Sequence, residues 1–280
     1  MRPTTRTPVN AGNRFASLMG ATLLACLSAV PVAVSAQWVN YPTPGTPRAP
    51  DGKPNLAASA PKTRDGKPDL AGIWMRVEGA NAPRSNPAGF PGRLSWYMPK
   101  GVEIPLQRWA EALFNQRAAN FGGGRPSQRC LPHGIPDAML YGGPLKIVQT
   151  PGLTMFLYET FNHYRQIFTD GRPFPRDPEP AWFGYSVAKW DGEAFVVDSQ
   201  GFNDQTWLDD TGLPHTEAMH TTERFRRRDF GHLDLQLTVD DPKAYTKPWS
   251  VNIGFDLLPD TELIEMICEN EKDTAHIVSK

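Results

Sequence analysis

The chain has 280 residues, and its 29 lysines and arginines against 30 aspartates and glutamates leave a formal net charge of −1. A hydrophobic content of 40% argues against full disorder, and the near-zero charge argues against a nucleic-acid partner, because phosphate binding needs a basic surplus. The 24 glycines and 28 prolines argue against a helical bundle, since each interior proline costs a helix about 3 kcal/mol.

Residues 1–36 have the features of a secretory signal peptide. Arginines without any acidic residue precede an apolar run over residues 15–34, and small residues end the segment at Ala36. We therefore expect an exported protein, periplasmic or secreted, with no membrane association after cleavage. Two alternatives remain open: a retained anchor, because the run approaches the roughly 20 residues of a span, and a lipoprotein signal at Leu23–Cys26.

Two cysteines, Cys130 and Cys268, remain after the expected cleavage. Disulfides persist in exported proteins, so the pair suggests one bridge that closes a long loop. The alternative is two buried thiols that never meet. Two prolines flank His133 and make a rigid turn beside Cys130, which we interpret as a cross-linked loop. The alternative is a turn that aims the side chain of His133 into a pocket.

Residues 37–70 form a linker-like, proline-rich stretch, which we expect to be an extended arm. Asp51–Ala57 and Asp65–Ala71 match at six of seven positions, and two copies are too few for a solenoid. The second copy leads into Gly72–Trp74, where the first strand is expected to start. Residues 71–280 are then predicted to form a single β-rich domain.

One early amphipathic helix is predicted, with Pro105 in its first turn and the glycine run 122–124 at its end. Its apolar stripe follows helical spacing: Leu106, Trp109, Ala110, Leu113 and Phe114.

Short apolar runs after Cys130 predict strands. In Leu233–Val239 apolar and polar residues alternate, which is typical of a strand with one buried face. Asp191-Gly192 predicts a hairpin. With about nine or ten strands and no alternation of strands and helices, we expect a mostly β fold, an antiparallel β-barrel or sandwich. The expected strands after Cys130 are Leu145–Thr150, Leu153–Tyr158, Tyr164–Phe168, Tyr185–Trp190, Glu193–Ser199, His220–Arg226, Leu233–Val239, Trp249–Asp256 and Leu263–Cys268.

Several phrases extend over nearly the whole chain after residue 36: DGKPDLAGIW (Asp65–Trp74), RCLPHGIP (Arg129–Pro136), KIVQTPGL (Lys146–Leu153), RQIFTDGRP (Arg165–Pro173), PHTEAMHTTERFRR (Pro214–Arg227) and CENEKD (Cys268–Asp273). By these phrases the chain resembles a largely uncharacterised family of exported bacterial proteins, and the resemblance implies no particular reaction. Separately, Gly72-Ile73-Trp74 is similar to the opening of lipocalins, which implies a small barrel with an internal cavity.

The densest group of chemically active side chains lies between Asp209 and Arg224. His215, Glu217 and His220 are enough for a three-ligand divalent-metal site with an open position. The five-residue spacing of the two histidines differs from the helical zinc motif.

The same residues also support metal-free chemistry. His215 would be the general acid or base, Asp209 or Glu217 would orient it, and His220 would be a second proton carrier. In the structural alternative the aspartates cap a turn and His220 is an ordinary strand residue.

A second polar group comprises Glu159, His163 and Arg165, which share one face if the strand is continuous. Arg165 would anchor an anionic group of the substrate, with Glu159 and His163 beside it. Trp207 would stack on the ligand. The alternative is a buried salt bridge between Glu159 and Arg165.

We therefore predict an enzyme that acts on a small molecule by His/carboxylate acid–base chemistry, with either no cofactor or a divalent metal. The reaction would be a hydrolysis, elimination or isomerisation, since the sequence shows neither a redox-cofactor motif nor a nucleophile elbow. The main alternative is a non-catalytic, lipocalin-like carrier of an apolar or aromatic ligand. A structural envelope protein is the third.

Overall fold

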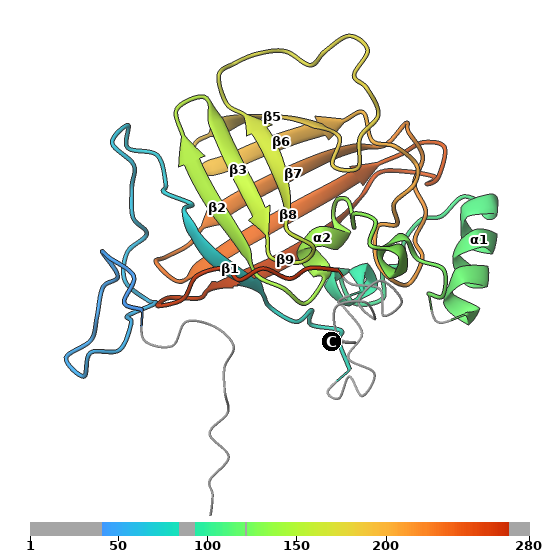
Figure 1. Ribbon diagram of the computed structural model, residues 1–280. Helices are drawn as coiled ribbons and strands as arrows, with labels where there is room; N and C mark the ends of the chain where they lie inside the picture. Colours follow the sequence, from blue (N-terminus) through green and yellow to red (C-terminus); the bar gives the residue numbers. More distant parts are fainter. Residues whose placement is uncertain (1–40, 84–92, 121, 269–280) are drawn as a thin grey trace, which may run out of the picture. The chain divides into compact units, whose positions relative to one another are not determined.

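This computed structural model describes residues 41–83, 93–120 and 122–268. Strands are the main regular elements of these residues. The expected signal peptide lies outside these residues. Each strand pairs with the next, and β9 pairs with β1, so the sheet is a closed barrel (Figure 1). This confirms the expected mostly β fold. The strands are β1 (Gly72–Arg76), β2 (Leu145–Thr150), β3 (Leu153–Tyr158), β4 (His163–Phe168), β5 (Tyr185–Asp191), β6 (Ala194–Gln200), β7 (His220–Arg227), β8 (His232–Asp240) and β9 (Trp249–Leu257).

One strand pair departs from the expected antiparallel pattern. β4 and β5 are parallel, with Ile167 opposite Ser186 and Phe168 opposite Val187. A parallel neighbour requires the chain to return to the same end of the sheet, and the long connection 169–184 does this.

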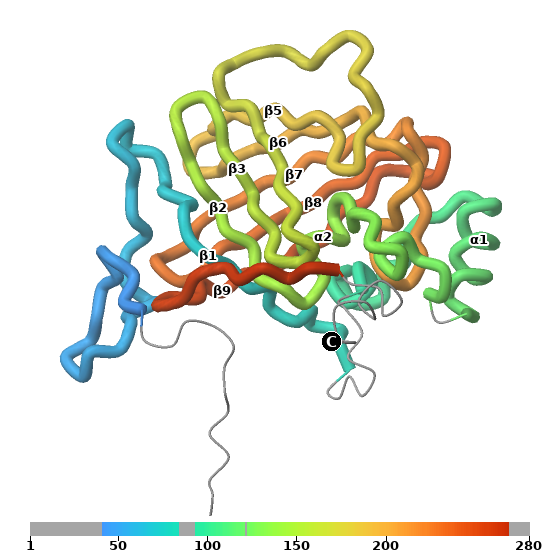
Figure 2. Tube along the Cα trace, in the orientation of Figure 1, coloured from blue at the N-terminus to red at the C-terminus, as the bar shows by residue number. Residues whose placement is uncertain are grey.

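The strand predicted at Leu263–Cys268 is wrong. The pairing of β1 with β9 closes the sheet, so no edge remains for another strand. The segment instead lies against the β3–β4 turn, where the backbone N–H of Ile264 donates to Glu159 and Met266 forms an isolated bridge with Thr160. Figure 2 shows this segment, in red, running back toward α2.

The helix α1 (Arg108–Ala119) confirms the predicted helix but begins later than Pro105. The residues before it are held by the β8–β9 connection, because Leu106 forms a bridge with Tyr245 and the backbone N–H of Gln107 donates to Ala244. The remaining helical segments are α2 (Asp137–Leu140) and the 3-10 turns η1 (Leu94–Tyr97) and η2 (Pro126–Arg129). No helix of the described residues is long and apolar enough to cross a membrane.

Apolar side chains fill the barrel. On β9 every second residue is buried, whereas Asn252 and Asp256 between them are exposed. The same alternation on β8 confirms the period-two pattern of the sequence. The buried residues of these two strands are Leu233, Leu235, Leu237, Val239, Trp249, Val251, Ile253, Phe255 and Leu257. They belong to one hydrophobic core with residues from η1, α2 and the β6–β7 connection.

The repeated sequence of the arm folds into two loops with the same hydrogen bonds. In the first, the backbone N–H of Gly52 donates to Ala49, and in the second that of Gly66 donates to Thr63. Both glycines have positive φ angles, +83° and +78°, which glycine adopts without strain. The arm is therefore folded on itself and not fully extended as expected. It lies at the end of the barrel opposite α2 (Figure 1).

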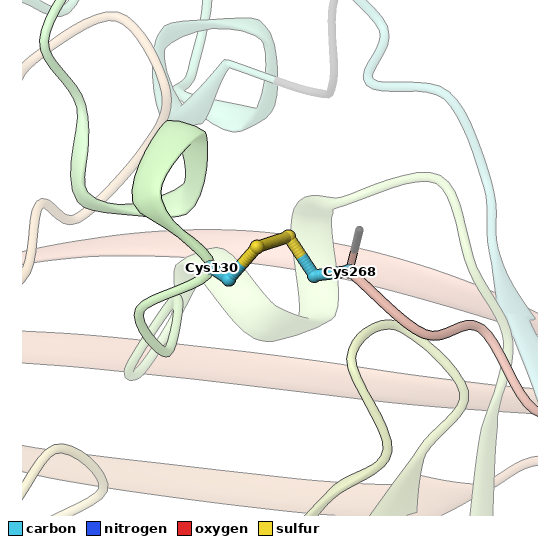
Figure 3. The surroundings of a disulfide bond; sticks show 2 residues. All are labelled: Cys130 and Cys268. Carbon is cyan, nitrogen blue, oxygen red and sulfur yellow. A yellow bond between two sulfur atoms is a disulfide. The ribbon is translucent and has the colours of Figure 1, made fainter. Parts of the chain in front are cut away.

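Cys130 and Cys268 form the predicted disulfide (Figure 3). The Cα atoms lie 5.4 Å apart, and the two residues are separated by 138 positions in the sequence. The bridge joins the C-terminal segment to the chain between η2 and α2.

Candidate functional site

A histidine and an aspartate lie four residues apart at the start of α2. His133 follows η2 and the disulfide-linked Cys130, and Asp137 is the first residue of α2. Between them Gly134 has a φ angle of +70°, and its carbonyl accepts the backbone N–H of Ala138. This turn brings both side chains to the same side of the chain.

A second carboxylate comes from the β6–β7 connection. Asp210 lies in a turn closed by a hydrogen bond from the backbone N–H of Gly212 to the Asp209 carbonyl. Gly122, at the end of α1, passes so close that an added Cβ would lie 2.2 Å from the carbonyl oxygen of Asp210. A glycine at this position therefore allows the α1–α2 segment to pack directly on the loop that carries the aspartates.

His133, Asp137 and Asp210 converge on one point, and we refer to them as the His133 cluster. Nδ1 of His133 lies 2.6 Å from Oδ2 of Asp137 and 4.0 Å from Oδ1 of Asp210. One potential ligand atom from each residue lies within 4.8 Å of the other two. The three residues are 3–4% exposed, so the cluster is buried.

Each member of the cluster keeps one polar atom without a hydrogen bond to any described residue. These atoms are Nε2 of His133, Oδ1 of Asp137 and Oδ2 of Asp210, and all three are inaccessible to solvent. Buried polar atoms in folded proteins almost always have partners, because an unsatisfied one costs about 1–3 kcal/mol. Three in one cluster indicate a place where a further group binds.

Burial controls the protonation of the cluster. It lowers the pKa of His133 to about 4, and burial together with the charge of Asp137 raises the pKa of Asp210 to about 7. Burial, reinforced by Asp209, raises the pKa of Asp137 well above its usual value. Both pKa shifts favour the neutral forms of the His133–Asp137 pair.

One cation and two aromatic rings surround the cluster. Nε of Arg125 lies 3.3 Å from Oδ2 of Asp210, which partly balances the carboxylates. The rings of Tyr141 and Phe161 have their centroids 4.3 Å and 5.2 Å from that of His133. Phe161 belongs to the β3–β4 turn and has a φ angle of 59°, which is uncommon for a residue other than glycine.

The structure places His215 elsewhere and gives it other partners than the predicted ones. It is buried in the β6–β7 connection, where Nε2 lies 2.6 Å from the Thr206 hydroxyl and Nδ1 lies 3.2 Å from the Thr216 carbonyl. Both ring nitrogens are thus occupied without a carboxylate. The prediction that Asp209 or Glu217 orients His215 is therefore wrong.

The other members of the predicted metal and proton-transfer set do not come together. Glu217 is exposed, and Nε2 of His220 on β7 lies 3.7 Å from a carboxylate oxygen of Asp198. Asp209 is buried and accepts hydrogen bonds from the backbone N–H groups of Leu94 and Thr211, as the structural alternative for it proposed. Among the described residues, only the His133 cluster brings three potential metal ligands within reach of one ion.

Arg165 faces the barrel interior but is already paired. From β4 it reaches across the barrel to β7, where Nη1 donates to Glu223 at 3.0 Å and Nη2 donates to the second carboxylate oxygen. It also donates to Ser186 and Ser199. The predicted role as an anchor for a substrate anion is therefore wrong, since the guanidinium is 2% exposed and neutralised.

Glu159, His163 and Trp207 do not surround Arg165. Glu159 lies in the turn after β3, because Phe161 and Asn162 break the strand, and it accepts the backbone N–H of Ile264. The predicted common face and the alternative salt bridge to Arg165 are therefore both wrong. His163 lies beside Phe161 near the cluster, and Trp207 packs under the guanidinium of Arg117 at 4.4 Å.

The sequence favoured a cross-linked loop over a turn that aims His133 into a pocket, and it did not indicate the partners of His133. Asp137 follows it by four residues, and this spacing was the available local signal. The contribution of Asp210 has no such signal, because it comes from a loop more than seventy residues further along the chain.

No protein-family model matches the chain, and no curated protein is significantly similar to it. The fold and the cluster define a closed β-barrel protein with a buried His/carboxylate centre near one end of the barrel.

Proposed function

We propose that this protein is an exported enzyme that acts on a small organic molecule and that the His133 cluster is its catalytic centre. The observation that carries the proposal is the convergence of three buried side chains, in which Nε2 of His133 and Oδ1 of Asp137 have no polar partner among the described residues. A purely structural cluster would satisfy these atoms, since leaving them unpaired is costly. A cluster that must receive a substrate group or an ion keeps them free.

The arrangement suits proton transfer. Asp137 holds one nitrogen of His133 and leaves Nε2 as the atom that can exchange a proton with a substrate. Arg125 and Asp210 supply a paired charge beside it. These groups support hydrolysis, elimination or isomerisation, because none of these reactions needs an electron carrier.

Access would come through the two aromatic rings that cover His133. Tyr141 and Phe161 are only partly buried, whereas the imidazole beneath them is 4% exposed. Backbone strain at Phe161 and its neighbour Asn162 is of the kind that gathers at functional sites. We infer that movement of this turn admits the substrate.

Export is supported by the disulfide, because such bonds persist mainly outside the reducing cytosol. The carrier alternative has less support, since the side chains of the strands fill the barrel. Trp190 lines a cavity of about 570 Å³ between the second arm loop and the β2–β3 turn, where the carrier alternative would place an aromatic ligand.

Comparison of His133→Gln with the wild type tests the proposal. Both proteins, spanning residues 37–280, are incubated with a small-molecule extract, and the compounds consumed are measured by mass spectrometry. We expect the variant to convert them about 10²- to 10⁴-fold more slowly, the usual contribution of a general acid or base. His232→Gln is the matched control, because His232 forms a similar pair with Asp229 in a half-exposed position. Equal rates for wild type and His133→Gln, or no conversion by the wild type, would contradict the proposal.

A further inference from the structure

We propose that the His133 cluster binds one first-row divalent transition-metal ion of the Zn²⁺ type. A catalytic role of the ion rests on the proposed function, whereas binding of the ion by the cluster does not. The ligands are one ring nitrogen of His133 and one carboxylate oxygen from each of Asp137 and Asp210, which already lie within 4.8 Å of one another.

The set of donor atoms selects the class of ion. Imidazole nitrogen and carboxylate oxygen are both zinc ligands, and catalytic zinc sites have three protein ligands with a fourth position open. Ca²⁺ and Mg²⁺ prefer sites made of oxygen atoms alone. Ligand atoms around Zn²⁺ lie about 3.3 Å apart in a tetrahedron, so a pair at the 4.8 Å limit would need to close by roughly 1.5 Å.

The unpaired atoms give independent support. Every member of the cluster is at least nine-tenths buried, and Nε2 of His133 and Oδ1 of Asp137 have no partner among the described residues. Asp210 has neighbours for both of its carboxylate oxygens, Arg125 at Oδ2 and the hydroxyl of Ser127 at Oδ1, so an ion that engages one of them leaves the other with a partner. A bound cation would then act as a partner for the buried polar groups of the cluster.

Arg125 distinguishes a metal site from a purely structural cluster. Its guanidinium is the positive charge nearest to Asp210 and would repel an incoming cation. Removing this charge without removing a ligand should therefore strengthen metal binding. A structural cluster with no affinity for cations would show no such gain.

The test is calorimetric titration of Zn²⁺ into tag-free protein spanning residues 37–280 that has been stripped with a chelator. We expect one equivalent to bind, with affinity lowered at least tenfold in Asp137→Asn and Asp210→Asn, unchanged in His232→Gln, and raised about tenfold in Arg125→Gln. Circular dichroism checks that each variant is folded. If an asparagine variant unfolds, Arg125→Gln decides, because it keeps all three ligands.

The wild type failing to bind one equivalent, or binding unchanged in every variant, would overturn the inference. These outcomes are distinct from failure of the proposed function. Stoichiometric Zn²⁺ binding without conversion of any compound would leave the metal site standing and remove the enzyme. Conversion of a compound by stripped protein that binds no Zn²⁺ would leave the enzyme standing and remove the metal site.

Discussion

At the scale of single residues, the chemistry of this chain depends on which buried charges find partners. Arg165 and Glu223 are 2% and 0% exposed and meet inside the barrel through two hydrogen bonds. In the His133 cluster, by contrast, Nε2 of His133 and Oδ1 of Asp137 have no partner among the described residues. The first arrangement holds the fold together, and the second is available for binding.

We predict that Glu223→Gln lowers the free energy of unfolding by about 3–5 kcal/mol, because it leaves the Arg165 guanidinium buried without its counter-charge. Urea unfolding measures the loss. The control is the double variant Arg165→Met/Glu223→Leu, which should recover most of the stability, since an apolar pair of similar volume removes both buried charges. A loss below about 1 kcal/mol in the single variant would show that the pair is not buried as described.

At the scale of elements, two connections build the candidate site. The α1–α2 segment packs against the β6–β7 connection through glycines at places where a side chain would collide. At Gly134 an added Cβ would lie 2.7 Å from a methyl group of Thr206, the residue whose hydroxyl contacts His215. The close approach therefore couples the His133 turn to the loop that carries Asp210.

We predict that Gly134→Ala destabilises the protein by about 2 kcal/mol, from the positive φ angle and the collision with Thr206. It should also weaken Zn²⁺ binding, because the two connections would separate. Gly142→Ala, between α2 and β2, is the control, because an added Cβ there meets nothing within 4 Å. Thermal unfolding of both variants gives the comparison, and equal midpoints would contradict the predicted coupling.

At the scale of the whole molecule, the disulfide ties the C-terminal segment to the chain just before His133. Between β9 and Cys268 this segment contacts the β3–β4 turn, so the bond also helps to hold Phe161 over the cluster. The sheet closes without it, because β1 pairs directly with β9.

We predict that Cys130→Ser/Cys268→Ser loses up to about 4–5 kcal/mol of unfolding free energy, as loop entropy implies for a separation of 138 residues. Hydrogen exchange should increase most in residues 259–268 and in the β3–β4 turn, while the barrel strands keep their protection. Wild-type protein treated with a reductant is the parallel sample and should behave in the same way. Unchanged stability and exchange in both samples would contradict this prediction.

Local patterns predicted much of the fold. The alternation in β8 and the runs at β2 and β3 were sufficient because burial of one face acts on neighbouring residues. The helix start and the final segment were predicted wrongly, since backbone pairing with distant residues decided both. The parallel pairing of β4 with β5 likewise depends on where a long connection returns.

The sequence by itself determined the strand-rich architecture, and its two cysteines correctly indicated the disulfide that the structure contains. Only the tertiary structure decided the site. Among the histidines, it surrounded His215 with hydroxyl and carbonyl partners and brought His133 to Asp137 and Asp210. The physical reason is that hydrophobic patterning is local in the chain, whereas the pairing of buried polar groups is set by packing between segments far apart in sequence.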